Sequence, residues 1–64
     1  MGYQALHALV DTTAYGVDGW HWCEVVEILK GTAAVYPIKV QIPDRGIGQY
    51  KEPEILDWQR RWVD

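Results

Sequence analysis

The clearest secondary-structure signal in the chain is a ten-residue apolar stretch, WHWCEVVEIL, at residues 20–29. Val, Ile and Trp favour β-strands, and successive strand residues point to opposite faces. The alternation divides the segment into Trp20, Trp22, Glu24 and Val26 on one side and His21, Cys23 and Val25 on the other. Because Val25 and Val26 are adjacent, either both faces are covered or a bulge changes the phase before Ile28.

A second strand is predicted at residues 35–42, VYPIKVQI, where apolar and polar positions alternate cleanly. The buried side of this strand is expected to carry Tyr36, Ile38, Val40 and Ile42. Pro37 cannot donate a ladder hydrogen bond, so it should lie at the start of the strand or on an unpaired edge. A short strand is predicted at residues 47–50.

Glycine, proline and aspartate divide these strands into a compact meander. A loop is predicted at residues 15–19 (YGVDG), with turns at residues 30–32 (KGT) and 43–46 (PDRG). Glycines at 16 and 19 supply the left-handed conformations that a tight reversal needs. Pro43 is expected at the first central position of its turn.

The two ends of the chain are less regular. Residues 5–10 suit an edge strand or a short helix, and the strand is favoured because Asp11, Thr12 and Thr13 follow without helical spacing. Residues 53–62 suit either a helix, with Asp57 and Arg61 spaced for an ion pair, or a 3₁₀ turn at residues 53–56 followed by a closing strand. Both alternatives bring Trp58 and Trp62 against the rest of the domain.

The length of 64 residues allows one domain, residues 1–64, with one small core. A chain this short buries only about 60 % of the surface it exposes when unfolded. The chain has four Trp and four Tyr but no Phe, so most of these aromatic rings are expected in the core. The single cysteine, Cys23, allows no internal disulfide and suits a reducing cytoplasm, and no apolar run suggests a signal peptide or a membrane span.

The middle of the chain also carries a family pattern: G-W-x-W-x-x-V-V-x-I, a turn, Y-P-I-x-V-x-I-P-D, a glycine, then x-Y-x-x-x-E-I-L. This pattern resembles the Tudor/KOW-type branch of SH3-like barrels over residues 19–56. The resemblance implies an all-β fold, a five-stranded SH3-like barrel with a short C-terminal helical turn or helix. It also implies functions such as reading methylated side chains, binding RNA or polymerase, or serving as a structural subunit. In the readers, an aromatic cage encloses the cation, and its nearest candidates here are Trp22, Tyr36 and Tyr50, with Trp20 and the acidic Asp44 nearby.

Catalytic and metal chemistry have little support in the sequence. His21 and Cys23 share a strand face, but His7 would have to complete a metal site. The carboxylates are explained by solvation and helix capping, and no acid and base are paired. The DRGIG stretch of residues 44–48 lacks the rest of a phosphate-binding motif. We therefore expect neither an enzyme nor a cofactor.

What remains is binding. The leading hypothesis is a small protein-interaction or assembly module, whose partner is another protein or a second copy of the chain. The residues expected to bind this partner are Trp20, Trp22, Tyr36, Asp44 and Tyr50. The alternative is nucleic-acid binding, in which Trp22 and Tyr50 stack on bases and the phosphates are contacted by Lys39, Arg45, Lys51, Arg60 and Arg61. A net charge of -3 makes nucleic acid the second choice, and no membrane or small-molecule substrate is expected.

Overall fold

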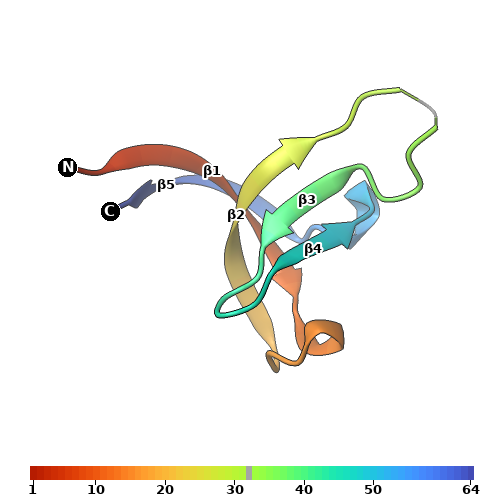
Figure 1. The fold of residues 1–64 in the computed structure, drawn as a ribbon, viewed down its shortest axis with the longest axis horizontal. Helices are drawn as coiled ribbons and strands as arrows, with labels where there is room; N and C mark the ends of the chain where they lie inside the picture. The colour runs from red at the N-terminus through yellow and green to blue at the C-terminus, as the bar shows by residue number, and fades with distance from the viewer. Residues whose placement is uncertain (32) are drawn as a thin grey trace.

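The computed structural model describes residues 1–31 and 33–64, and it is all-β. The elements are β1 (Tyr3–Asp11), η1 (Thr13–Tyr15), β2 (Trp20–Ile28), β3 (Ile38–Gln41), β4 (Ile47–Tyr50), η2 (Glu52–Glu54) and β5 (Asp57–Val63), where η marks a 3₁₀ turn. The five strands are antiparallel and form one sheet in the order β4-β3-β2-β1-β5 (Figure 1). The all-β prediction is confirmed. The predicted KGT turn includes Thr32, which lies outside the described residues.

β2 connects the two halves of the sheet. Its first part pairs with β1, from Asp11↔Trp20 to His7↔Glu24, and its second part pairs with β3, from Val25↔Val40 to Ile28↔Ile38. The register shifts between Val25 and Glu27, so of the two alternatives left open by the adjacent valines the strand takes the bulge. A bulge bends a strand, and this one lies where β2 passes from one partner to the other (Figure 1).

The C-terminal segment takes the second of its two predicted forms, a 3₁₀ turn followed by a strand. β5 pairs with β1 at seven positions, from Leu9↔Asp57 to Tyr3↔Val63. β1 therefore lies inside the sheet, and the prediction that it forms an edge strand was wrong, because β5 covers its other side. In a strand, residues four apart share a face and lie about 13 Å apart, so Asp57 and Arg61 do not form the ion pair that a helix would have allowed.

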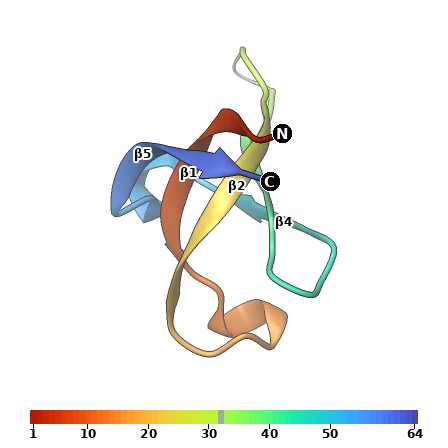
Figure 2. The same ribbon diagram turned by 90° about the vertical axis from the view of Figure 1, so that its left-hand side faces the viewer.

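The predicted closed barrel was also wrong, because β4 and β5 remain at opposite edges of the sheet. The first four residues of β1 pair with β5 alone, since the β1–β2 register begins at His7↔Glu24. This two-stranded arm projects from the rest of the sheet and carries both termini (Figure 1). η1 lies at the other end of β1 (Figure 2). The strands thus diverge instead of closing on one another.

The core is built from small and aliphatic side chains on one face of the sheet. It comprises Ala8, Val10, Cys23, Ile38, Val40, Ile42 and Tyr50. Of the eight aromatic residues only Tyr50 belongs to it, so the expectation of an aromatic core was wrong. The physical reason is that aliphatic residues of β1 and β3 fill the inner face, whereas Trp58 and Trp62 lie on the diverging β5 and stay exposed.

The strand predicted at residues 35–42 is shorter in the structure, where β3 is Ile38–Gln41. Ile38, Val40 and the following Ile42 are buried as expected, but Tyr36 is 44 % exposed. Leu29 donates its N–H to the carbonyl of Pro37 (2.8 Å). Tyr36 therefore lies in the connection ahead of the strand, and its predicted burial was wrong.

The predicted reversals have the backbone conformations that their residues favour. Gly16 and Gly19 take left-handed φ angles of 88° and 93°. After β3, Arg45 donates its N–H to the carbonyl of Ile42 (3.0 Å), which makes Pro43 the first central residue of this turn. Asp44 follows with φ 57°, a left-handed conformation that aspartate tolerates better than most residues.

Candidate functional site

Trp20 and Trp22 project from the outer face of the sheet, opposite to the core. The register places Trp22 opposite Leu9, and since Ala8 and Val10 are fully buried, their neighbours on β1 point outward. Trp20 is 52 % exposed and Trp22 is half-buried. The prediction that these two indoles share a strand face is confirmed by this register.

Two further contacts connect β5 and the start of β1 to this face of β2, one with Trp22 and one with Glu24. The guanidinium carbon of Arg61 lies 5.5 Å from the centre of the Trp22 ring, a cation–π distance. The hydroxyl of Tyr3 donates to Oε2 of Glu24 at 3.4 Å, on the same side of the sheet. We refer to Tyr3, Leu9, Trp20, Trp22 and Arg61 as the outer aromatic face.

The other predicted partner-binding residues lie elsewhere. Tyr36 is in the β2–β3 connection, where Nζ of Lys51 is 5.3 Å from the centre of its ring. Asp44 is in the β3–β4 turn, and Tyr50 is buried on the inner face. Trp22 and Tyr50 thus project from opposite faces of the sheet, and the structure does not assemble them with Tyr36 into one aromatic cage.

The basic residues proposed for phosphate contacts are also dispersed. Arg60 and Arg61 are consecutive in β5 and therefore point to opposite faces. Arg45 donates its Nε–H to the carbonyl of Tyr15 at 3.3 Å, in the loop region at the far end of β1. Lys39 lies on β3 and Lys51 is directed to the Tyr36 ring. The described contacts do not unite these cations in a single surface.

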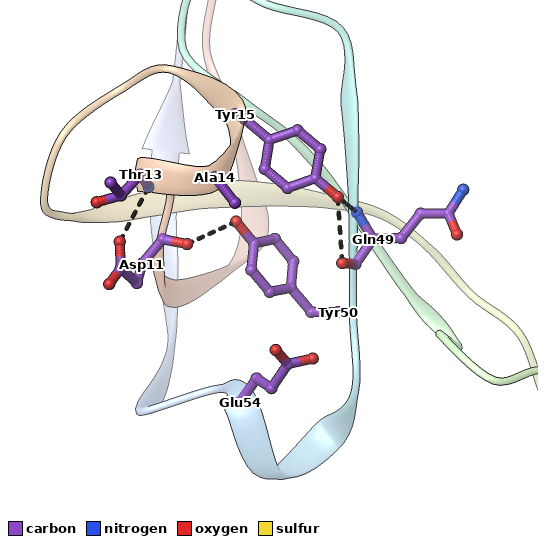
Figure 3. A pocket seen from close by; sticks show the side chains of 7 residues that line it. All are labelled: Asp11, Thr13, Ala14, Tyr15, Gln49, Tyr50 and Glu54. Carbon is purple, nitrogen blue, oxygen red and sulfur yellow. Dashed lines mark hydrogen bonds between the residues drawn. The ribbon is translucent and has the colours of Figure 1, made fainter.

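A cleft of about 750 Å³ lies between η1, β4 and η2 (Figure 3). Its lining residues are Asp11, Thr13, Ala14, Tyr15, Gln49, Tyr50 and Glu54. The rings of Tyr15 and Tyr50 lie 5.9 Å apart, tilted by 51°. Sequence reasoning did not find this cleft. Tyr15 falls in the predicted loop at residues 15–19, and only the folded chain brings it to β4.

Hydrogen bonds within the chain hold the polar groups of this cleft. The Tyr50 hydroxyl donates to the carbonyl of Asp11 (2.9 Å), and burial raises the pKa of Tyr50 to about 12. Hydrogen bonding by Thr13, through its side chain and its backbone N–H, lowers the pKa of the Asp11 carboxyl. Glu54 accepts the N–H of Lys51 at 2.7 Å. The cleft is lined by the carboxylates of Asp11 and Glu54, which disfavours anionic ligands such as nucleic acid.

The residues weighed for metal binding do not converge. His21 and Cys23 lie on the inner side of β2, while His7 pairs with Glu24 on the outer side. Within residues 1–31 and 33–64, no group of three or more His, Cys, Asp or Glu side chains is arranged to hold a metal ion.

In the same part of the chain, no helix has the length and apolar character needed to cross a membrane.

Comparison of the chain with protein-family models, curated proteins and solved structures gives no match.

Proposed function

We propose that this chain is a protein-interaction module that docks on a protein partner through the outer aromatic face. The observation that carries the proposal is Trp20, which is 52 % exposed beside the half-buried Trp22. Neither indole belongs to the core of a domain that has few large buried side chains. Exposed Trp residues are frequent hot spots of protein interfaces, where a partner removes them from water.

The neighbouring strands hold the side chains of the outer aromatic face in place, and this also favours binding. β2 is hydrogen-bonded to β1 and β3, and Trp22 stands opposite Leu9 on β1 with the Arg61 guanidinium of β5 over its ring. Side chains that are held in place before binding lose less conformational entropy on association. A protein partner would therefore meet a largely preformed surface.

The order of the elements supports a relationship to the Tudor/KOW-type SH3-like barrels. β2 begins at Trp20, its hairpin partner β3 ends in the turn containing Asp44, and a single 3₁₀ turn, η2, precedes the last strand. These are the features on which the resemblance rests. Because the sheet is open, the proposed relationship concerns the order of elements and not barrel closure.

Nucleic-acid binding has less support than protein binding. The five basic residues considered for it are distributed over both faces of the sheet and the loop end, and the cleft beside η1 is acidic. Binding to a phosphate backbone relies on several cations that act together.

The test of the proposed function compares two variants of the immobilised protein. Proteins captured from a host extract are identified by mass spectrometry, and the affinity of each is then measured with purified components. The double substitution Trp20→Ala and Trp22→Ala should weaken binding by about thirtyfold, as expected for loss of interface hot spots. The matched control is Val35→Ala, which removes an exposed apolar side chain from the β2–β3 connection, away from both the outer aromatic face and β5. Unchanged affinity of a folded double variant would refute the proposal.

A further inference from the structure

The two edges of the sheet differ in how far they are protected. β4 has only four residues, and the hydroxyl of Tyr15 occupies its outer side by accepting the N–H of Gln49 (2.8 Å) and donating to its carbonyl (3.3 Å). β5 has seven residues and pairs only with β1. Its sequence DWQRRWV contains no proline or glycine to interrupt the edge. Long, regular edge strands are templates for pairing with another chain.

The hydrogen bonds between β1 and β2 show which backbone groups of β5 point away from β1. Thr12 donates its N–H to the carbonyl of Gly19 (3.0 Å), which continues the register of Val10↔His21 and Ala8↔Cys23. The even-numbered residues of β1 therefore bond to β2, and its odd-numbered residues bond to β5.

It follows from the register that the odd-numbered residues of β5 bond to β1, while Trp58, Arg60 and Trp62 direct their backbone groups to the free edge. The N–H of Trp58 fits this assignment, because it donates to Oδ1 of Asp57 at 2.8 Å. The short side chain of Asp57 therefore binds the outward N–H of Trp58, which a neighbouring strand would otherwise bind.

We propose that a second copy of this chain pairs with β5 in antiparallel orientation, with Gln59 on the two-fold axis, so that the two sheets join into one of ten strands. Trp58 then stands opposite Arg60 of the second copy, and both residues carry the outward backbone groups that such a ladder needs. In the dimer the Trp58 N–H exchanges Oδ1 of Asp57 for the carbonyl of that Arg60, which frees the Asp57 carboxylate. This interface goes beyond the proposed function, because it uses the backbone of the β5 edge, and it shares only Arg61 with the outer aromatic face.

The charges of β5 favour this register. Asp57 comes opposite Arg61 of the second copy, and the symmetry repeats this pair. Within one chain the two residues lie about 13 Å apart along the strand, so their opposite charges meet only between copies. A two-fold axis at Arg60 or at Arg61 would instead place like charges directly opposite each other, which destabilises a ladder.

The same register removes exposed apolar groups from water. Leu56 and Trp62, which are 64 % and 71 % exposed, come opposite each other across the two copies. Trp58 gains a guanidinium neighbour from Arg60 of the second copy, which is a favourable cation–π arrangement. The arm formed by β1 and β5 also gains a third strand, and two-stranded ribbons are only marginally stable alone.

Disulfide trapping tests the position of the proposed two-fold axis at residue 59. In Gln59→Cys, the two new cysteines face each other as a non-hydrogen-bonded pair, with Cα atoms about 4.5 Å apart, within the range that a disulfide spans. Cys23 is 1 % exposed and does not compete. Mild oxidation should convert Gln59→Cys to a covalent dimer, while Gln49→Cys on the other edge stays monomeric. Equal trapping of both variants, or stronger trapping of Arg60→Cys than of Gln59→Cys, would overturn the proposed register.

Sedimentation of the charge variants tests the pairing itself. Asp57→Arg and Arg61→Asp should each weaken dimerisation about tenfold, because each brings like charges together. The double variant should restore dimerisation, because the ion pair between residues 57 and 61 of the two copies is then present with its charges reversed. Dimers that are insensitive to these changes, or a wild-type protein that stays monomeric at about 1 mM, would overturn the proposal.

A proline substitution in β5 tests whether the backbone of this edge is needed for dimerisation in a protein that still folds. Arg60→Pro removes an outward N–H and should give a folded monomer, whereas Arg60→Ala keeps that N–H and the dimer. Trp20→Ala, which keeps the Trp22 ring that Arg61 contacts, should leave dimerisation unchanged, so failure of this inference and failure of the proposed function can be told apart. A β5 edge that pairs with an unrelated extended peptide and not with a second copy would also refute the inference.

Discussion

The hydroxyl of Tyr15 accepts the N–H of Gln49 at 2.8 Å and donates to the carbonyl of the same residue at 3.3 Å, which ties η1 to the outer edge of β4. The two residues are 34 positions apart in the chain. Because one hydroxyl serves both backbone groups, it takes the place of a neighbouring strand at this point. This contact leaves β5 as the uncovered edge of the sheet.

Replacing Tyr15 by Phe should destabilise the domain by about 1 kcal/mol, because the two backbone groups of Gln49 lose their partner while the ring can still pack on Tyr50. Urea denaturation measures the change. Tyr36→Phe is the control, since the residue is 44 % exposed, and it should have little effect. Equal stability of Tyr15→Phe and wild type would show that water replaces the hydroxyl without loss.

The buried Tyr50 should make stability depend on alkaline pH. Its folded-state pKa is raised from 10.0 to about 12, so its contribution is fully present below pH 10.0 and is lost as the pH rises toward 12. Urea denaturation across this range should show a loss of stability that is smaller in Tyr50→Phe. The variant should also be less stable at neutral pH by about 1 kcal/mol, because the carbonyl of Asp11 loses its donor. An identical pH dependence in both proteins would contradict this account.

Gly48 should not tolerate a side chain. An added Cβ would lie 2.6 Å from Cδ1 and 2.8 Å from Cγ1 of Ile42, which is fully buried and cannot move aside. Gly48→Ala should therefore cost about 1–3 kcal/mol, as for other overpacked cores. Gly46→Ala is the matched control, because its Cβ would meet nothing within 4 Å. Thermal denaturation of the two variants should separate them clearly, and equal melting temperatures would refute the explanation.

Cys23 should be unreactive in the folded protein. It is 1 % exposed, and burial raises the pKa of its thiol, so little thiolate is available for attack. Its reaction with a thiol reagent at mildly alkaline pH should be slow in buffer and fast in urea. Gln49→Cys provides the control, since residue 49 is exposed on β4 and should add one thiol that reacts without denaturant. Rapid modification of wild-type protein under native conditions would show that the core opens readily.

Much of the local structure could be predicted from the sequence. The alternation at residues 20–29 predicts β2 and the facing of Trp20 and Trp22, and the adjacent valines give its bulge as one of two alternatives. The strand at residues 47–50 and the left-handed glycines at 16 and 19 follow from equally local patterns. These features depend on side-chain period and backbone sterics, which act over a few residues.

The positions of the aromatic rings could not be predicted in this way. Composition suggested an aromatic core, but Trp62 is 71 % exposed because β5 diverges from the rest of the sheet. The cleft beside Tyr15 was also missed, since its walls come from elements that are far apart in the chain. Whether a ring is buried depends on which strands lie over it, and that is a property of the assembled sheet.

The sequence by itself determined an all-β chain, most of its strand positions, and the side of β2 from which Trp20 and Trp22 project. Only the tertiary structure decided that the C-terminal segment is a strand, that it pairs with β1, and that the sheet stays open with a free β5 edge. Local patterns leave such choices undecided because the spacing of Asp57 and Arg61 places them on one face of a helix or of a strand alike. The hydrogen bonds of the β1–β5 ladder, formed between the two ends of the chain, settle the choice.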